Sequence, residues 1–160
     1  MIFLDIVKNS FKLPSKNAMR SLNKIGMDYT VFYMFLLLLV ASVPSFLDQL
    51  LSPSSGTEIN LFLFIIYFFM FFYLPFVLII FGLLSLLAYI ALIIANIFER
   101  KLTFGLLWKL LAYTTTIPFL LYTAIALFYD FSVVYLAFSS IYSLILIIIM
   151  ILSFPRRRKS

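Results

Sequence analysis

The chain has 160 residues, of which 65% are hydrophobic and 11% charged, and it contains neither Cys nor His. A soluble domain carries about 45–50% apolar and roughly 25% charged residues, and so small a core could not bury the excess. This composition excludes a soluble globular domain, a disordered chain, a disulfide scaffold and a metal site made of Cys or His. It predicts an all-α bundle of membrane-spanning helices.

The net charge is +6, from 12 Lys and Arg against 6 Asp and Glu. The basic residues form three clusters between long apolar runs, a pattern typical of cytoplasmic loops. We therefore expect their partner to be the anionic lipid of the inner leaflet and not nucleic acid. The cations expected to face lipid are Lys8, Lys12, Lys16, Arg20 and Lys24 near the N-terminus and Arg156, Arg157, Arg158 and Lys159 at the C-terminus, and the middle cluster comprises Arg100, Lys101 and Lys109.

Residues 1–27 are predicted to form a cytoplasmic amphipathic segment. One helix over 2–13 ends at Pro14, and Ser15 can cap a second short helix. Apolar side chains share one face of each helix and cations the other, so we expect both helices to lie in the headgroup plane. A specific partner surface is the alternative. The apolar faces comprise Ile2, Phe3, Ile6, Val7, Phe11 and Leu13 in the first helix and Ala18, Leu22 and Ile25 in the second.

Long apolar runs predict a transmembrane domain at residues 28–154, because a spanning helix needs about 20 mostly apolar residues. Trp108 beside Lys109 is expected at the membrane–water interface, where such rings gather. A basic cytoplasmic tail at 155–160 follows the last run. The predicted spans lie near 29–47, 75–97, 106–128 and 131–154.

The run from Leu61 to Ile97 is too long for one simple crossing. A straight helix of this length would extend roughly 55 Å, against about 30 Å for the hydrocarbon core. It is either one span preceded by an outer or re-entrant segment at 61–73, broken at Pro75, or two tightly turned spans. One span gives four crossings and leaves every cationic cluster on the side of both termini, whereas five crossings would push one cluster outside. We therefore prefer four spans with both termini cytoplasmic.

The spans hold no ionisable side chain well inside, so they offer no acid–base pair and no activated nucleophile. Asp28, Asp48, Glu99, Lys109 and Asp130 all fall at span ends or in loops. The sequence thus predicts a non-enzymatic protein without cofactor or metal, and it disfavours a coupled proton or sodium pump.

Small and hydroxyl side chains recur in the spans. In the second span, small residues every three or four positions let helix backbones approach closely, within one molecule or between two copies. In the third and fourth spans, hydroxyls can bond between helices, and we favour such packing over a polar groove for a small solute or lipid headgroup. Pro118 is expected to kink the third span, its freed carbonyl satisfied by nearby Thr hydroxyls. The small residues are Gly82, Ser85, Ala88, Ala91 and Ala95, and the hydroxyls are Tyr113, Thr116, Thr123, Ser132, Ser139 and Ser143.

Several short motifs resemble a known family. They are Phe3, Ser10-Phe11, Arg20, Gly26 and Pro44, then Arg100-Lys101-Leu102-Thr103, Leu107-Trp108-Lys109, Ala112-Tyr113, Ile117-Pro118 and Pro155. In these the chain resembles small multi-pass membrane proteins of Bacillus-type Gram-positive bacteria, a domain family of unknown function. Some of its members are labelled maltodextrin-utilisation proteins, and the pattern is distantly similar to Yip-type membrane domains. The resemblance implies the plasma membrane of a Gram-positive bacterium; it brings no catalytic residue, and the longer insert of such members is reduced here to 48–60.

Two functions follow from these features. The one we favour is a membrane accessory or scaffold protein that engages lipid and partner membrane proteins, or a second copy of itself. The alternative is a small transporter or channel component with a polar path between the third and fourth spans.

Overall fold

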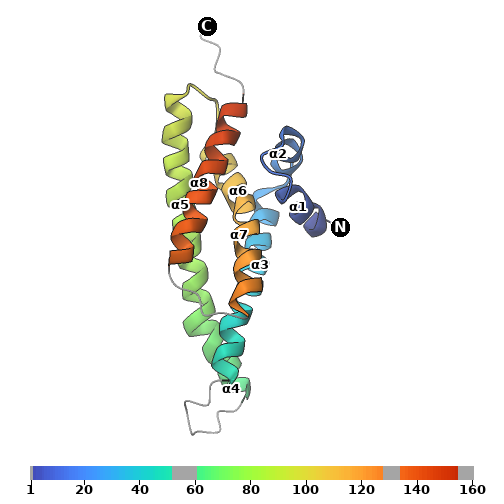
Figure 1. The fold of residues 1–160 in the computed structure, drawn as a ribbon, viewed down its shortest axis with the longest axis vertical. Coiled ribbons are helices and arrows are strands. Elements are labelled where there is room, and N and C mark those ends of the chain that lie inside the picture. The colour runs from blue at the N-terminus through green and yellow to red at the C-terminus, as the bar shows by residue number, and fades with distance from the viewer. Residues whose placement is uncertain (1, 52–60, 128–133, 155–160) are drawn as a thin grey trace.

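The computed structural model describes residues 2–51, 61–127 and 134–154, and it confirms the all-α prediction, with no β-strand in these ranges (Figure 1). The chain folds into a bundle of helices of very different lengths. In chain order they are α1 (Ile2–Ser10), α2 (Lys16–Asn23), α3 (Met27–Leu51), α4 (Leu61–Phe68), the π-helix η1 (Phe69–Tyr73), α5 (Leu74–Ile97), α6 (Phe104–Thr114), α7 (Thr116–Ala126) and α8 (Val134–Ser153).

Three helical stretches are long and apolar enough to cross a membrane: Met27–Leu51, Leu61–Ile97 and Phe104–Ala126. α8 contributes a shorter apolar stretch, Ala137–Ser153. These helices fit an integral membrane protein. The count of four crossings stays a prediction.

Leu61–Ile97 is one continuous helix of 37 residues, with η1 as an irregular turn inside it. At that turn the N–H of Leu74 donates to the carbonyl of Phe69, a wide π-type hydrogen bond just before Pro75. Because proline has no N–H and crowds the preceding turn, a π turn lets the helix pass it without ending. We expected the helix to break at Pro75, but it continues through this residue. The segment 61–73 and the predicted span 75–97 therefore form one continuous helix.

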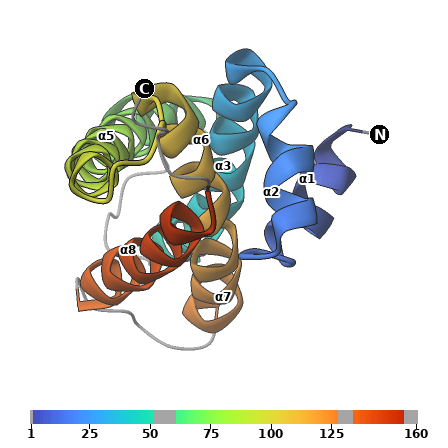
Figure 2. The same ribbon diagram turned by 90° about the horizontal axis from the view of Figure 1, so that it is seen from above.

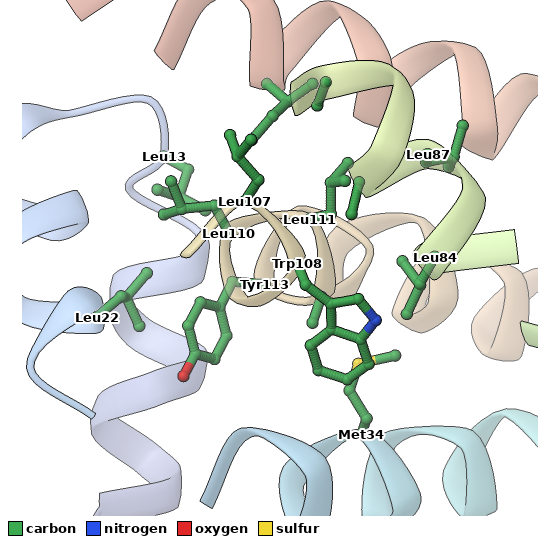
Figure 3. Close-up of a cluster of buried hydrophobic side chains, with 14 of the residues drawn as sticks. Leu13, Leu22, Met34, Leu84, Leu87, Leu107, Trp108, Leu110, Leu111 and Tyr113 are labelled. Carbon is green, nitrogen blue, oxygen red and sulfur yellow. The ribbon is translucent and has the colours of Figure 1, made fainter. Parts of the chain in front are cut away.

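The core of the fold lies around α6, which packs against α5, α8, α3, α2 and α1 (Figure 2). Every side chain of 107–114 except Lys109 is buried. Figure 3 shows Leu13 and Leu22 on one side of α6 and Leu84 and Leu87 of α5 on the other. A helix buried on almost all sides explains why this stretch is mostly apolar apart from Lys109.

Trp108 packs against α5 inside the bundle, and its expected depth at the membrane–water interface stays a prediction. Only 4% of its surface is exposed. Its indole N–H donates to the Ser85 hydroxyl at 3.3 Å, and its ring lies 5.5 Å from that of Phe81. A buried indole needs such a hydrogen-bond partner, and the hydroxyl of α5 provides it.

The apolar faces of α1 and α2 are covered largely by the bundle, whereas we expected them to face lipid. Ile6 and Leu22 are completely buried, and Leu13, Ala18 and Met19 are nearly so. Helices of eight or nine residues are unstable alone, so packing on α6 stabilises them. Val7 and Ile25 are half-buried against the core, whereas Phe3, Leu4 and Phe11 stay exposed.

Lys109 fastens the N-terminal segment to the bundle. Its Nζ donates to the carbonyl of Asn23 at 3.0 Å and to that of Ile25 at 2.9 Å. These carbonyls belong to the end of α2 and the linker to α3, where helix carbonyls lack intrahelical donors. A cation in this place satisfies them and fixes where α2 ends.

Thr115 separates α6 from α7, three residues before Pro118, and the bend lies where a proline distorts the preceding turn. The Thr114 hydroxyl donates to the carbonyl of Leu111 at 2.7 Å, and the Thr115 hydroxyl to that of Ala112 at 2.8 Å. We expected these hydroxyls to satisfy the carbonyl that Pro118 frees, which is that of Thr114. They bond carbonyls of the preceding turn instead, because a Thr side chain in a helix reaches back three or four residues.

Candidate functional site

Two pairs of hydroxyls join α3 to the bend between α6 and α7. The Tyr113 and Thr30 hydroxyl oxygens are 2.6 Å apart, and those of Tyr33 and Thr116 are 2.8 Å apart. None of the four side chains is more than 4% exposed, and the two tyrosine rings lie 6.1 Å apart. We call Thr30, Tyr33, Tyr113 and Thr116 the hydroxyl cluster.

The hydrogen-bond direction in one pair follows from proton counting. Thr30 donates its single hydroxyl proton to the carbonyl of Gly26 at 3.1 Å, so Tyr113 must donate to the Thr30 oxygen. The cluster contains no carboxylate, amine or imidazole that could activate a hydroxyl. Its geometry suits the joining of helices.

Two of the candidate hydroxyls of the third predicted span, those of Tyr113 and Thr116, face α3 and not α8. Tyr113 and Thr116 bond to α3, because α7 packs along α3. Thr123 bonds within its own helix, to the carbonyl of Phe119 at 2.8 Å. These residues therefore do not meet Ser139 and Ser143.

Three serines of α8 border a small cavity on the side of α5. Ser139, Ser140 and Ser143 border a cavity of about 20 Å³ together with Thr115 and apolar residues of α5. A water molecule needs about 10–15 Å³, so this space suits roughly one water and no larger solute. The Ser143 hydroxyl is buried there without a hydrogen-bond partner in the described part of the chain. Ser132, the remaining hydroxyl candidate, lies outside the described residues.

The small residues of α5 serve packing inside the molecule, with one exception. Ala88, Ala91 and Ala95 are completely buried, and α5 packs against α6 and α8. The Ser85 hydroxyl donates to the carbonyl of Phe81 at 2.8 Å and accepts from the indole of Trp108. Gly82 instead lies on the exposed side, where a Cβ would meet nothing within 4 Å.

The basic residues divide into two groups. All five cations of the N-terminal cluster are exposed on α1, α2 and their flanking turns. Two cations of the middle cluster turn inward to backbone carbonyls: Lys109 as described above, and Arg100, whose Nη1 donates to the carbonyl of Phe154. Residues 156–159 lie outside the described part of the chain.

Thr30 and Tyr33 were not among the candidates from sequence, although they form half of the hydroxyl cluster. A signal for them is present. They are three residues apart on α3, and Tyr113 and Thr116 are three residues apart on the partner segment. Two hydroxyl pairs with the same spacing lie on one helical face each and can match in a single contact between segments that run in the same direction, Thr30 with Tyr113 and Tyr33 with Thr116.

Within the described ranges no three His, Cys, Asp or Glu side chains lie close enough together to hold a metal ion. Comparison with known proteins finds no matching family model, curated protein or solved structure. The resemblance to the Bacillus-type membrane proteins thus stays a prediction based on its short motifs.

Proposed function

We propose that this is a non-enzymatic integral protein of the plasma membrane that acts as an accessory or scaffold protein. In this proposal the chain crosses the membrane four times with both termini in the cytoplasm. Its exposed cations attract anionic lipid of the inner leaflet, and its exposed apolar helix faces contact lipid and partner membrane proteins.

The observation that supports this proposal best is that several buried polar side chains form hydrogen bonds between helices of the bundle. The hydroxyl cluster pairs its members with each other, and the indole of Trp108 is paired with Ser85. Such interhelical bonds hold a bundle together and leave little polar surface along which a solute could move. Exposed charge is instead concentrated on α1 and α2, where a partner or a lipid headgroup can reach it.

A transporter or channel component is the second candidate function. A cavity of about 160 Å³ between α7 and α8 supports it, because Ser139 and the rings of Tyr135 and Tyr142 border this space. Tyr135, however, already donates to the carbonyl of Pro118 at 2.6 Å. The remaining lining is apolar, which suits an acyl chain better than a polar solute.

Reconstitution into liposomes separates the two functions. We expect the purified protein to move no small solute across the bilayer, and to co-purify in gentle detergent with membrane proteins of its native host. Solute flux that is lost in Thr116→Ala and Ser139→Val would overturn the accessory function. Thr123→Val is the matched control, because its hydroxyl bonds only within α7.

A further inference from the structure

A cavity lies between α2 and the C-terminal end of α8. Both of these elements lie toward the same end of the bundle (Figure 1). The cavity volume is about 110 Å³, enough for several water molecules or for one phosphate group. Its walls are Lys16, Met19, Arg20 and Asn23 of α2 together with Ser153 and Phe154.

The lining combines cationic donors with an apolar base. Lys16 and Arg20 are one helical turn apart, so both side chains lie on the same face of α2. Asn23 adds an amide donor, and none of the described lining residues is acidic. Arg presents a planar fork of donors and Lys a mobile point charge, which together are typical ligands of phosphate.

Both walls of the cavity are held in place by the middle basic cluster. Lys109 bonds the carbonyls of Asn23 and Ile25 and so fixes the end of α2. Arg100 bonds the carbonyl of Phe154 and so fixes the end of α8. Because these two cations are used on backbone carbonyls, Lys16 and Arg20 are the cations that the described part of the lining offers to an anion.

We propose that this cavity binds the phosphate group of an anionic phospholipid from the inner leaflet. This assignment rests on the proposed function, which places α1 and α2 at that leaflet. Lipid is favoured over free phosphate because the cavity has apolar walls in Met19 and Phe154 and adjoins the apolar surface of α8, where Ile149 and Leu152 are exposed. A headgroup held there can lay its acyl chains along that surface.

The test measures lipid retention by the full chain in neutral detergent, using native mass spectrometry with phosphatidylglycerol or phosphatidylcholine of the same acyl chains. We expect selective retention of phosphatidylglycerol and about 10- to 30-fold weaker retention in Lys16→Gln/Arg20→Gln, given the attraction that each cation contributes near a lipid surface. The matched control is Lys8→Gln/Lys12→Gln, which removes the same charge from positions that do not line the cavity.

Two more variants keep the test conclusive if the Gln pair does not fold. Lys16→Arg/Arg20→Lys keeps both charges and should retain the lipid. Ser153→Leu fills the cavity without changing any charge and should weaken retention. If the Gln pair fails to give a monodisperse helical protein, Ser153→Leu decides the question alone.

Three results would overturn the cavity assignment, and they differ in what else they affect. Equal loss in the two Gln pairs would show attraction by net charge only, and the proposed function would stand. Displacement of the lipid by millimolar inorganic phosphate would make this a site for free phosphate. Equal retention of the two lipids by the unaltered chain would remove both the cavity assignment and the lipid part of the proposed function.

Discussion

The hydrogen bond between Tyr33 and Thr116 gives the sharpest test of the hydroxyl cluster. Tyr33→Phe and Thr116→Val each remove one hydroxyl with little change of shape. The bond is 2.8 Å long and both side chains are buried, so neither hydroxyl can turn to water. Hydrogen bonds between spanning helices contribute about 0.6 kcal/mol on average and up to about 1.7 kcal/mol. We expect a coupling energy in this range.

The measurement is a double-mutant cycle on the free energy of unfolding in mixed detergent micelles. Each single variant should lose about 1 kcal/mol, since it leaves its partner buried and unpaired. The double variant should lose less than the sum of the two, and the difference is the coupling energy. Thr123→Val removes a hydroxyl that bonds only the carbonyl of Phe119 in its own helix, so we expect less than about 0.5 kcal/mol.

Additive losses in the cycle would refute the pairing of α3 with the bend. A cost for Thr123→Val as large as that for Thr116→Val would refute the reasoning in another way. It would mean that the loss of any Thr hydroxyl, and not the loss of an interhelical bond, lowers stability.

Three further predictions address the rest of the fold. Lys109→Met keeps the apolar stem but loses both bonds to the α2 linker, so hydrogen exchange in 16–26 should become about tenfold faster; unchanged exchange would contradict the anchoring role. Ala91→Leu overfills a completely buried position and should cost about 1–3 kcal/mol in thermal unfolding, whereas Gly82→Ala meets nothing within 4 Å and should leave stability unchanged or raise it by up to about 1 kcal/mol. Because the chain has no Cys, Ser54→Cys should react with an impermeant maleimide on intact cells and Thr103→Cys only after permeabilisation. Labelling of Thr103→Cys from outside would rule out four crossings.

Composition and apolar run length were enough to predict an all-α fold, because a helix satisfies every backbone group within one continuous apolar run of about 20 residues. They did not predict how the chain passes Pro75. A proline can end a helix, kink it or be absorbed by a π turn, and the choice depends on the packing around it. Here Tyr73, in that turn, donates to the carbonyl of Phe35 at 2.9 Å, and this contact with α3 accompanies the continuous path.

Two of the four residues of the hydroxyl cluster, Tyr113 and Thr116, were candidates from the sequence, whereas their partners on α3 were not. Helical spacing shows which residues share a face, and it singled out Tyr113 and Thr116 as polar positions in an apolar helix. It does not show which neighbour that face meets. The third span is adjacent in sequence to the fourth, which made α8 the natural partner, but α7 packs along α3. The hydroxyl partners are thus separated by 83 residues in the chain, and only the tertiary fold reveals them.

The amphipathic pattern of residues 1–27 likewise shows which side chains share a face, but not what that face packs against. The ring of Phe35 packs against that of Phe81, and from this level α5 continues for about 24 Å to Ile97 while α3 continues for only about 12 Å to Met27. α3 therefore leaves one side of α6 uncovered, and Leu13 and Leu22 pack against that side (Figure 3). An apolar stripe opposite cations suits a headgroup layer or a protein groove equally well, so its pattern could not decide between them. α1 and α2 complete the bundle where α3 ends, so their exposed cations lie closer to the middle of the bundle than the apolar end of α5 does. The cations and the end of α5 are therefore at two different heights along the bundle axis. A tilt of the helix Leu61–Ile97 in the bilayer would bring both to the same membrane surface.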